Sequence, residues 1–160
     1  MNIQHKARSG TMIQPGRHDT YKNLGKLREP TICSGCGAVY LDGRWSWAGA
    51  PGGAHKAVCS ACQRTADRFP AGRIEMGGAF FKEHRDEILH LVRNVEATEK
   101  KERPMERIMA IEDDGDQVVV TTTGIHVARR IGESLSHSYQ GEFDFQYGDG
   151  EDSIRVTWLR

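Results

Sequence analysis

The residues best suited to chemistry in this sequence are four cysteines arranged as two pairs. Cys33 and Cys36 form one Cys-x-x-Cys motif, Cys59 and Cys62 form a second, and 22 residues separate the two motifs. Each motif can aim two sulfurs at one point, and two such pairs complete a tetrahedral shell for one Zn²⁺ ion. Because a four-thiolate shell leaves no coordination position open, we expect a structural zinc ion and not a catalytic one.

The residues next to the cysteines favour the same interpretation. Gly35 and Gly37 flank Cys36 and permit the tight backbone that such a turn requires. Two other uses of the cysteines remain open, namely two disulfides or a redox-active Cys-x-x-Cys motif. The N-terminal sequence has no apolar stretch of the kind found in secretory signals, so we expect a cytoplasmic protein, whose reducing surroundings favour metal binding over disulfides.

The charges of the chain cancel in sum but not along its length. Lys and Arg number 22, and Asp and Glu also number 22. Residues 1–30 hold six basic and two acidic side chains, and residues 31–75 hold five and three. Residues 76–108 hold seven of each, whereas residues 109–160 hold four basic and ten acidic side chains. This polarity predicts that the basic end binds a polyanion.

Basic side chains interleaved with aromatic ones are typical of nucleic-acid surfaces, where cations contact phosphates and indole rings stack on bases. Trp45 and Trp47 have an alternative use, because they could instead cover the small core around the cysteines. The candidate RNA-binding residues are Lys6, Arg8, Arg17, Lys22, Lys26 and Arg28 near the N-terminus, Arg44, Trp45, Trp47, Lys56, Arg64, Arg68 and Arg73 around the cysteines, and His126, Arg129 and Arg130 in a predicted helix.

Four segments must position these residues. Residues 1–30 have no apolar period and predict a flexible basic tail. Residues 31–75 predict the zinc-binding module, a zinc ribbon or treble-clef-like fold, with a short strand at residues 44–47 and one or two helical turns over residues 60–68. Residues 76–104 predict an amphipathic linking helix, in which Phe81, Ile88, Val92 and Val95 share one face over residues 79–102.

Residues 105–160 predict a ββαββ unit, a four-stranded sheet with one helix on one face. Asp113-Asp114-Gly115-Asp116 indicates a hairpin between the first two strands. Thr123 is the expected N-cap of the helix, Gly141 follows its end, and Gly132 on its apolar face indicates close approach to the sheet. The predicted elements are strands at 105–112 and 117–122, a helix at about 124–140, and strands around 143–147 and 154–158. The fold class is therefore α+β.

Composition argues against a membrane protein and against an enzyme. The mean hydropathy is −0.59, and no apolar run approaches the roughly 18 residues that a membrane helix needs. No Gly-x-Ser-x-Gly or His-Glu-x-x-His motif occurs, and no cysteine remains for nucleophilic work once the two pairs are assigned. We therefore expect no catalytic residue and no small-molecule substrate.

The C-terminal segments resemble a known family. The segments IHVARRIG (125–132), YQGEFDF (139–145) and IRVTW (154–158) resemble a block in the Nmd-three family, the export adaptor of the large ribosomal subunit in eukaryotes, with shorter archaeal relatives. Members of that family also begin with zinc-binding Cys-x-x-Cys pairs. Residues 31–160 are more similar still to short bacterial zinc-ribbon proteins that share this block. The resemblance implies contact with the ribosome or rRNA and no catalytic activity.

The charge polarity and the resemblance lead to one expected function and one alternative. We expect a non-enzymatic, ribosome-associated zinc protein that binds rRNA of the large subunit, and ribosomal proteins beside it, in assembly or in stress-related, hibernation-like occupancy of a functional site. The alternative is a zinc-stabilised protein-interaction or regulatory module that binds no RNA. Salt dependence separates them, because phosphate contacts weaken steeply as salt rises.

Overall fold

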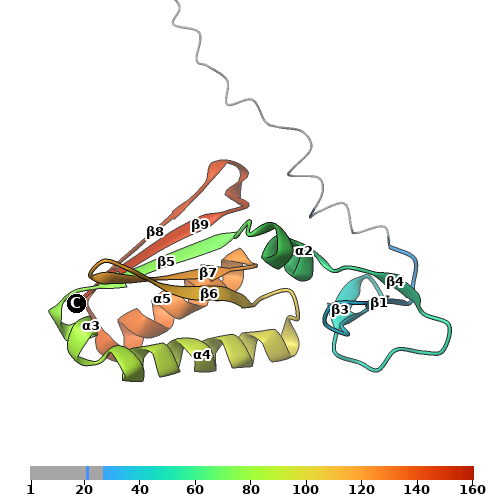
Figure 1. The fold of residues 1–160 in the computed structure, drawn as a ribbon, viewed down its shortest axis with the longest axis horizontal. Coiled ribbons are helices and arrows are strands. Elements are labelled where there is room, and N and C mark those ends of the chain that lie inside the picture. The colour runs from blue at the N-terminus through green and yellow to red at the C-terminus, as the bar shows by residue number, and fades with distance from the viewer. Residues whose placement is uncertain (1–20, 22–26) are drawn as a thin grey trace, which may run out of the picture.

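A computed structural model of the protein describes residue 21 and residues 27–160. Apart from Tyr21 and residues 27–30, the predicted basic tail lies outside the described residues. Figure 1 shows two parts, a cysteine module (residues 31–67) and a sheet domain (residues 72–160). Together they give an α+β chain, which confirms the predicted fold class.

The cysteine module consists of four short strands and one helix. The elements are β1 (Thr31–Cys33), β2 (Val39–Leu41), β3 (Arg44–Ser46), β4 (His55–Ala57) and α2 (Ser60–Asp67). The strands form one mixed sheet in the order β3-β2-β1-β4, with β1 antiparallel to β2 and parallel to β4. The short strand and the short helix expected on either side of the second cysteine pair are thus confirmed as β3 and α2.

The sheet domain is a five-stranded sheet with helices on one face. Its strands are β5 (Gly72–Gly77), β6 (Ile108–Asp114), β7 (Gln117–Thr122), β8 (Glu142–Tyr147) and β9 (Ile154–Leu159). Their order is β6-β7-β5-β9-β8, and β5 pairs antiparallel with β7 and parallel with β9. The hairpin expected at Asp113–Asp116 is confirmed as the turn between β6 and β7, where Gly115 has a φ of 62°.

The four-stranded ββαββ prediction is wrong in its strand number, because β5 is the central strand of five. Ile74 and Met76 of β5 are fully buried, whereas Arg73 is exposed, as the alternation of a strand requires. The predicted boundary after residue 75 falls inside this strand. The alternation of apolar and polar residues that marks β5 covers only a few residues between glycines. The helix predicted from residue 76 onward included the end of this strand, so the strand was missed.

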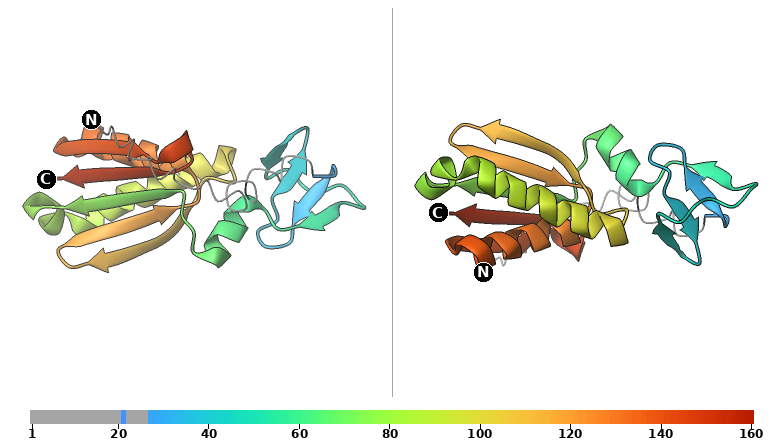
Figure 2. Two further views of the ribbon diagram at one scale, coloured as in Figure 1. Left: turned by 90° about the horizontal axis from the view of Figure 1, so that it is seen from above. Right: turned by 90° about the horizontal axis from the view of Figure 1, so that it is seen from below.

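Two helices pack on one face of the sheet, rather than the single helix predicted. Figure 2 shows α4 (Arg85–Glu102) and α5 (Ile125–Tyr139) side by side across this face. Their apolar sides enclose the core, with Val92 of α4 and Ile131 of α5 fully buried beside the strands. The helix predicted over residues 79–102 is interrupted at His84, where the short α3 (Ala79–Glu83) ends and α4 begins.

Glycine lets α5 approach the sheet closely. A Cβ at Gly132 would lie 2.5 Å from an atom of Phe143 and 2.6 Å from one of Val156, so the expected close approach is confirmed. The N-cap prediction is wrong: the cap residue is Gly124, and the Thr123 hydroxyl instead donates to the Met105 carbonyl at 2.6 Å. None of the helices in the described part of the chain combines the length and apolar character needed to cross a membrane.

Candidate metal centre

The four cysteines lie on two local structures that the chain brings together. Cys33 ends β1, and Cys36 follows in the turn that leads to β2. Cys59 is the N-cap of α2, and Cys62 lies in the first turn of that helix. The first pair therefore sits in a strand-to-strand turn and the second at a helix N-terminus, and β4, which pairs with β1, leads the chain from one to the other.

Two glycines make this arrangement possible. Gly37 has a φ of 82°, a left-handed conformation that glycine adopts without strain, and its N–H donates to the Cys33 carbonyl at 2.9 Å. Gly35 leaves room for the second pair, because a Cβ there would lie 3.0 Å from the Cys62 sulfur. The expected backbone role is confirmed for Gly37, whereas Gly35 serves the site through the space that it leaves for Cys62.

The sulfur positions fit a single metal ion. All four cysteines are free, and their Sγ atoms lie within 4.8 Å of one another. The Cys33–Cys62 and Cys36–Cys59 sulfur pairs are each 3.8 Å apart. A tetrahedral centre with metal–sulfur bonds of about 2.3 Å has sulfur–sulfur edges of about 3.8 Å. The four cysteines can therefore hold a metal ion, and the separations are far longer than the roughly 2.05 Å of a disulfide.

Backbone N–H groups support negative charge on these sulfurs. The Gly35 and Cys59 N–H groups donate to the Cys33 sulfur at 3.3 and 3.2 Å. Burial acts to raise the pKa of the Cys33 thiol, but these backbone bonds outweigh it and lower the pKa to about 6. Burial raises the pKa of Cys59, and the charge of nearby Cys36 raises it further. Four thiolates this close together would need a cation among them, and the sulfurs are placed to hold one.

An arginine from the sheet domain completes the surroundings of the sulfurs. The Arg107 guanidinium donates to Cys36 Sγ at 3.0 Å, to Cys62 Sγ at 3.5 Å and to Cys59 Sγ at 3.6 Å. Burial acts to lower the pKa of Arg107, but the bonds to the sulfurs outweigh it and raise the pKa. A tetrathiolate around a dication carries two negative charges, and a permanent cation on its surface offsets part of that charge.

Further contacts hold the cysteine module against the sheet domain beside Arg107. The Ser60 hydroxyl lies 3.3 Å from Met105 Sδ, and Met105 packs on the buried cluster around the cysteines. The Trp47 indole N–H donates to the Lys100 carbonyl at 2.7 Å, and the Arg107 guanidinium lies 5.6 Å from the Trp47 ring centroid. The segment from the end of α4 to β6 thus docks on the four cysteines.

The tryptophans serve the structure of this region. Trp45 packs against the cysteine cluster and meets Tyr40 edge to face, with ring centroids 5.4 Å apart. Trp47 is 38% exposed but uses its indole N–H in the contact with α4. The alternative role predicted for both tryptophans was to cover the small core around the cysteines. Trp45 fills this role fully and Trp47 fills it in part.

The predicted RNA-binding cations of the cysteine region fall into three groups. Arg28, Arg44, Lys56 and Arg68 are exposed and form no ion pair with any carboxylate among the described residues. Arg64 is half-buried, with its guanidinium 4.2 Å from the Tyr21 ring centroid. Arg73 lies on β5 of the sheet domain and pairs with Glu75 at 3.1 Å. Five predicted residues lie outside the described part of the chain: Lys6, Arg8, Arg17, Lys22 and Lys26.

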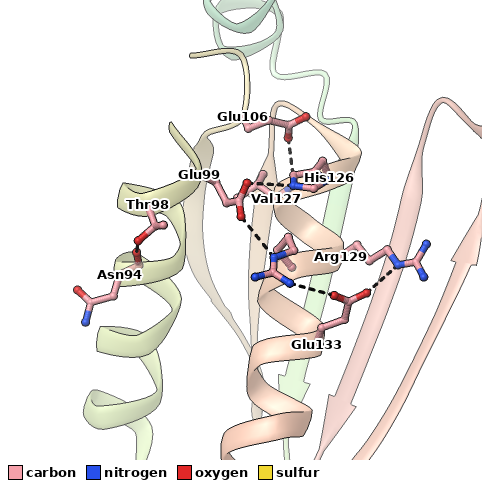
Figure 3. Close-up of polar contacts among 9 residues, drawn as sticks. Asn94, Thr98, Glu99, Glu106, His126, Val127, Arg129 and Glu133 are labelled. Carbon is pink, nitrogen blue, oxygen red and sulfur yellow. Dashed lines mark hydrogen bonds and ion pairs between the residues drawn. The ribbon is translucent and has the colours of Figure 1, made fainter. Parts of the chain in front are cut away.

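The predicted RNA-binding residues of α5 are held by carboxylates. Figure 3 shows Glu99 of α4 facing His126, whose Nε2 lies 2.9 Å from the Glu99 carboxylate, and Glu133 beside Arg129 at 2.9 Å. Arg130 lies 3.3 Å from Glu99 and 3.5 Å from Glu133. A phosphate group would have to displace these carboxylates in order to bind the three side chains. The sequence alone did not reveal these ion pairs.

Sequence reasoning missed Arg107 and three cations near the cysteine module. Lys100, Lys101 and Arg103, at the C-terminal end of α4, form no ion pair among the described residues. Arg103 and Arg44 line the same cleft of about 630 Å³, between β3 and the segment that follows α4. The excess of basic residues over residues 100–107 was visible in the sequence, but its proximity to the cysteines was not.

A buried carboxylate in the same segment caps α5. Glu106 accepts the Val127 N–H at 3.0 Å, in the first turn of the helix, and only glycine fits at position 124, where a Cβ would overlap the carboxylate. Burial raises the pKa of Glu106, although the Val127 N–H and nearby cations act to lower it. The folded chain therefore holds this proton more tightly than the unfolded chain does.

This shift predicts a pH-dependent contribution to stability. The contribution of Glu106 to the free energy of unfolding falls as pH rises from the pKa of the unfolded chain, about 4.3, through the raised pKa of the folded chain. Above the folded pKa, this contribution no longer changes with pH. Glu106→Gln removes this titration and can keep an acceptor for Val127. As pH rises over this window, the free energy of unfolding measured in urea should therefore fall less for the variant than for wild type. A difference between variant and wild type that does not change with pH would contradict the assignment.

Comparison of the chain with protein-family models, with curated proteins and with solved structures finds no match. The geometry of the cysteines and of the charged side chains around them therefore carries the functional argument.

Proposed function

We propose that the four cysteines bind one structural Zn²⁺ ion. The support is the all-thiolate donor set, the tetrahedral spacing of the sulfurs and the backbone N–H groups directed at them. We favour a treble-clef-like module over a zinc ribbon for three reasons. The first cysteine pair lies in a turn, a β2–β3 hairpin follows it, and the second cysteine pair lies at the start of a helix. The zinc ion would supply the folding energy that this small module lacks, because only four residues make up its buried cysteine cluster.

We further propose that this zinc-stapled protein is non-enzymatic and binds RNA, with ribosomal RNA of the large subunit as its target. The observation that carries the proposal is the distribution of cations without carboxylate partners. Among the described residues, those in or beside the cysteine module are Arg28, Arg44, Lys56, Arg64, Arg68, Lys100, Lys101, Arg103 and Arg107. Arg64 lies over the Tyr21 ring and Arg107 on the cysteine sulfurs, so the other seven are the ones open to phosphate. In the rest of the sheet domain, apart from Arg93 and Arg160, the Arg and Lys side chains pair with carboxylates.

Unpaired cations matter because a phosphate can bind them without displacing another anion. Each phosphate contact releases counterions and adds about 0.7–0.9 to the slope of log affinity against log salt. Arg44 and Arg103, on opposite sides of one cleft, form the best-placed pair for a single strand. The resemblance to ribosome-binding proteins selects rRNA among possible RNAs, and assembly or stress-related occupancy as the role.

Sedimentation of the full-length protein with ribosomes at several salt concentrations tests this proposal. We expect co-sedimentation at low salt that weakens steeply as salt rises. Arg44→Gln with Arg103→Gln should reduce the salt slope by about 1.4–1.8. The control Lys82→Gln with Arg85→Gln removes the same charge from cations paired with Asp116 and Asp113, and it should leave the slope unchanged.

Two outcomes would overturn the proposal. The first is a protein that stays at the top of the gradient at low salt, in extracts of growing and starved cells alike. The second is binding that does not depend on salt, which is the behaviour expected of the alternative function, a zinc-stabilised protein-interaction module.

A further inference from the structure

Strand β8 forms one edge of the five-stranded sheet. It pairs with β9 alone, in antiparallel register from Glu142↔Leu159 to Tyr147↔Ile154, and no other described strand lies on its outer side. Figure 1 shows β8 at the margin of the sheet. One row of its backbone N–H and C=O groups therefore lacks a strand partner, and such an edge is a template for a further strand.

β8 carries few of the features that usually protect an exposed edge. Its sequence, EFDFQY, contains no proline and no lysine, and its register with β9 runs without a bulge. Phe143, Phe145 and Tyr147 lie on the helix side of the sheet and form an aromatic row, with successive ring centroids 5.8 and 5.7 Å apart. Glu142 and Asp144 project from the opposite side.

The charges of β8 indicate what would pair with it. Glu142 and Asp144 are exposed and form no ion pair among the described residues. At the other edge of the sheet, Asp113 pairs with Arg85 at 2.8 Å and Asp116 with Lys82 at 3.0 Å, whereas Glu112 of β6 forms no ion pair among the described residues. Two unpaired acids on one face oppose pairing with a second copy of β8, since like charges would meet across the strands. A basic strand would meet opposite charges.

The aromatic row also favours a cationic partner. The Arg129 guanidinium lies 4.7 Å from the Phe145 ring centroid and donates to the Tyr147 hydroxyl at 2.8 Å. This contact shows that the row already binds a guanidinium within the chain. Tyr147 remains 36% exposed, so a second side chain can reach it. Both faces of β8 are therefore suited to Lys or Arg.

We infer that β8 accepts a basic, extended segment of a partner protein as a sixth strand of the sheet. The partner's backbone would pair with the free edge, and its basic side chains on one face would lie beside Glu142 and Asp144. This surface is independent of the RNA binding proposed above, because it uses no residue of the cysteine module.

A synthetic peptide of alternating lysine and valine, six residues long and blocked at both ends, tests this inference on the full-length protein. Its binding, followed by fluorescence anisotropy, should slow amide hydrogen exchange in residues 142–147. Glu142→Lys with Asp144→Lys should weaken binding about tenfold. The control Glu83→Lys with Glu112→Lys changes the net charge equally at exposed acids away from β8 and should leave the affinity unchanged.

A peptide with proline at its second and fourth positions, which keeps all three lysines, should bind at least tenfold more weakly, because proline cannot donate to the strand ladder. Equal weakening by both lysine variants would indicate general charge attraction and would overturn the inference. So would a peptide that slows no exchange in β8, or sedimentation showing that the protein dimerises through β8. None of these outcomes bears on ribosome binding, so the two proposals fail separately.

Discussion

Cys36→Ser is expected to abolish tight metal binding and to unfold the cysteine module, while the sheet domain stays folded. Cys36 supplies one of four thiolates and also accepts the shortest of the Arg107 hydrogen bonds to sulfur, at 3.0 Å. Structural zinc sites contribute on the order of 10 kcal/mol to folding, far more than the small apolar cluster around the cysteines can replace. The sheet domain has its own buried core and does not depend on this cluster.

Metal analysis and amide hydrogen exchange check this expectation together. Wild type should carry about one equivalent of zinc, and Cys36→Ser should carry much less. Exchange should become fast over residues 31–67 and remain slow in β5, β7 and β9. Ser34→Ala, an exposed change within the same turn, should behave as wild type. A Cys36→Ser protein that keeps slow exchange throughout the module would contradict the proposal that a bound metal ion keeps this module folded.

Arg107→Met is expected to weaken zinc binding by about 10–100-fold and to loosen the cysteine module from the sheet domain. The substitution keeps an unbranched side chain but removes the three contacts with sulfur, the contact with the Trp47 ring and the Nε–H bond to the Pro104 carbonyl. Partners that surround metal ligands typically contribute affinity of this size. Arg107→Lys keeps the charge without the planar fork and should fall between wild type and Arg107→Met.

A chelator competition assay measures the affinity, and small-angle X-ray scattering measures how the two parts are held together. Arg103→Met is the matched control, because Arg103 lies four residues earlier and has no described contact with sulfur. We expect this control to match wild type in both measurements. If Arg107→Met binds zinc within twofold of wild type, Arg107 does not stabilise the thiolate centre.

Local patterns were sufficient to predict the features that depend on neighbouring residues. The spacing of the cysteines indicated a single site, and the four sulfurs do gather within 4.8 Å. The apolar period over about residues 124–140 and the position of Gly132 predicted a helix close to the sheet, as found for α5. In each case, the evidence lies within one element or one short motif.

Features that depend on distant pairing were not predicted. β5 is central only because β7 and β9 lie on either side of it, and β9 is some 80 residues further along the chain. Arg107 reaches Cys36 across 71 residues, and nothing in its local sequence indicates that contact. His126 and Arg130 were predicted to bind phosphate because their carboxylate partner was not apparent from the sequence. That partner is Glu99 on another helix, 27 and 31 residues away.

X-ray absorption at the zinc edge, on protein purified under reducing conditions, shows which atoms surround the metal ion that we propose. In that proposal, one zinc ion held by Cys33, Cys36, Cys59 and Cys62 organises the module that, together with the end of α4, carries the cations without carboxylate partners. We predict a single shell of four sulfur neighbours at about 2.3 Å, with about one zinc ion per chain. A folded, metal-free protein containing two disulfides, or a shell with oxygen or nitrogen among its members, would contradict it.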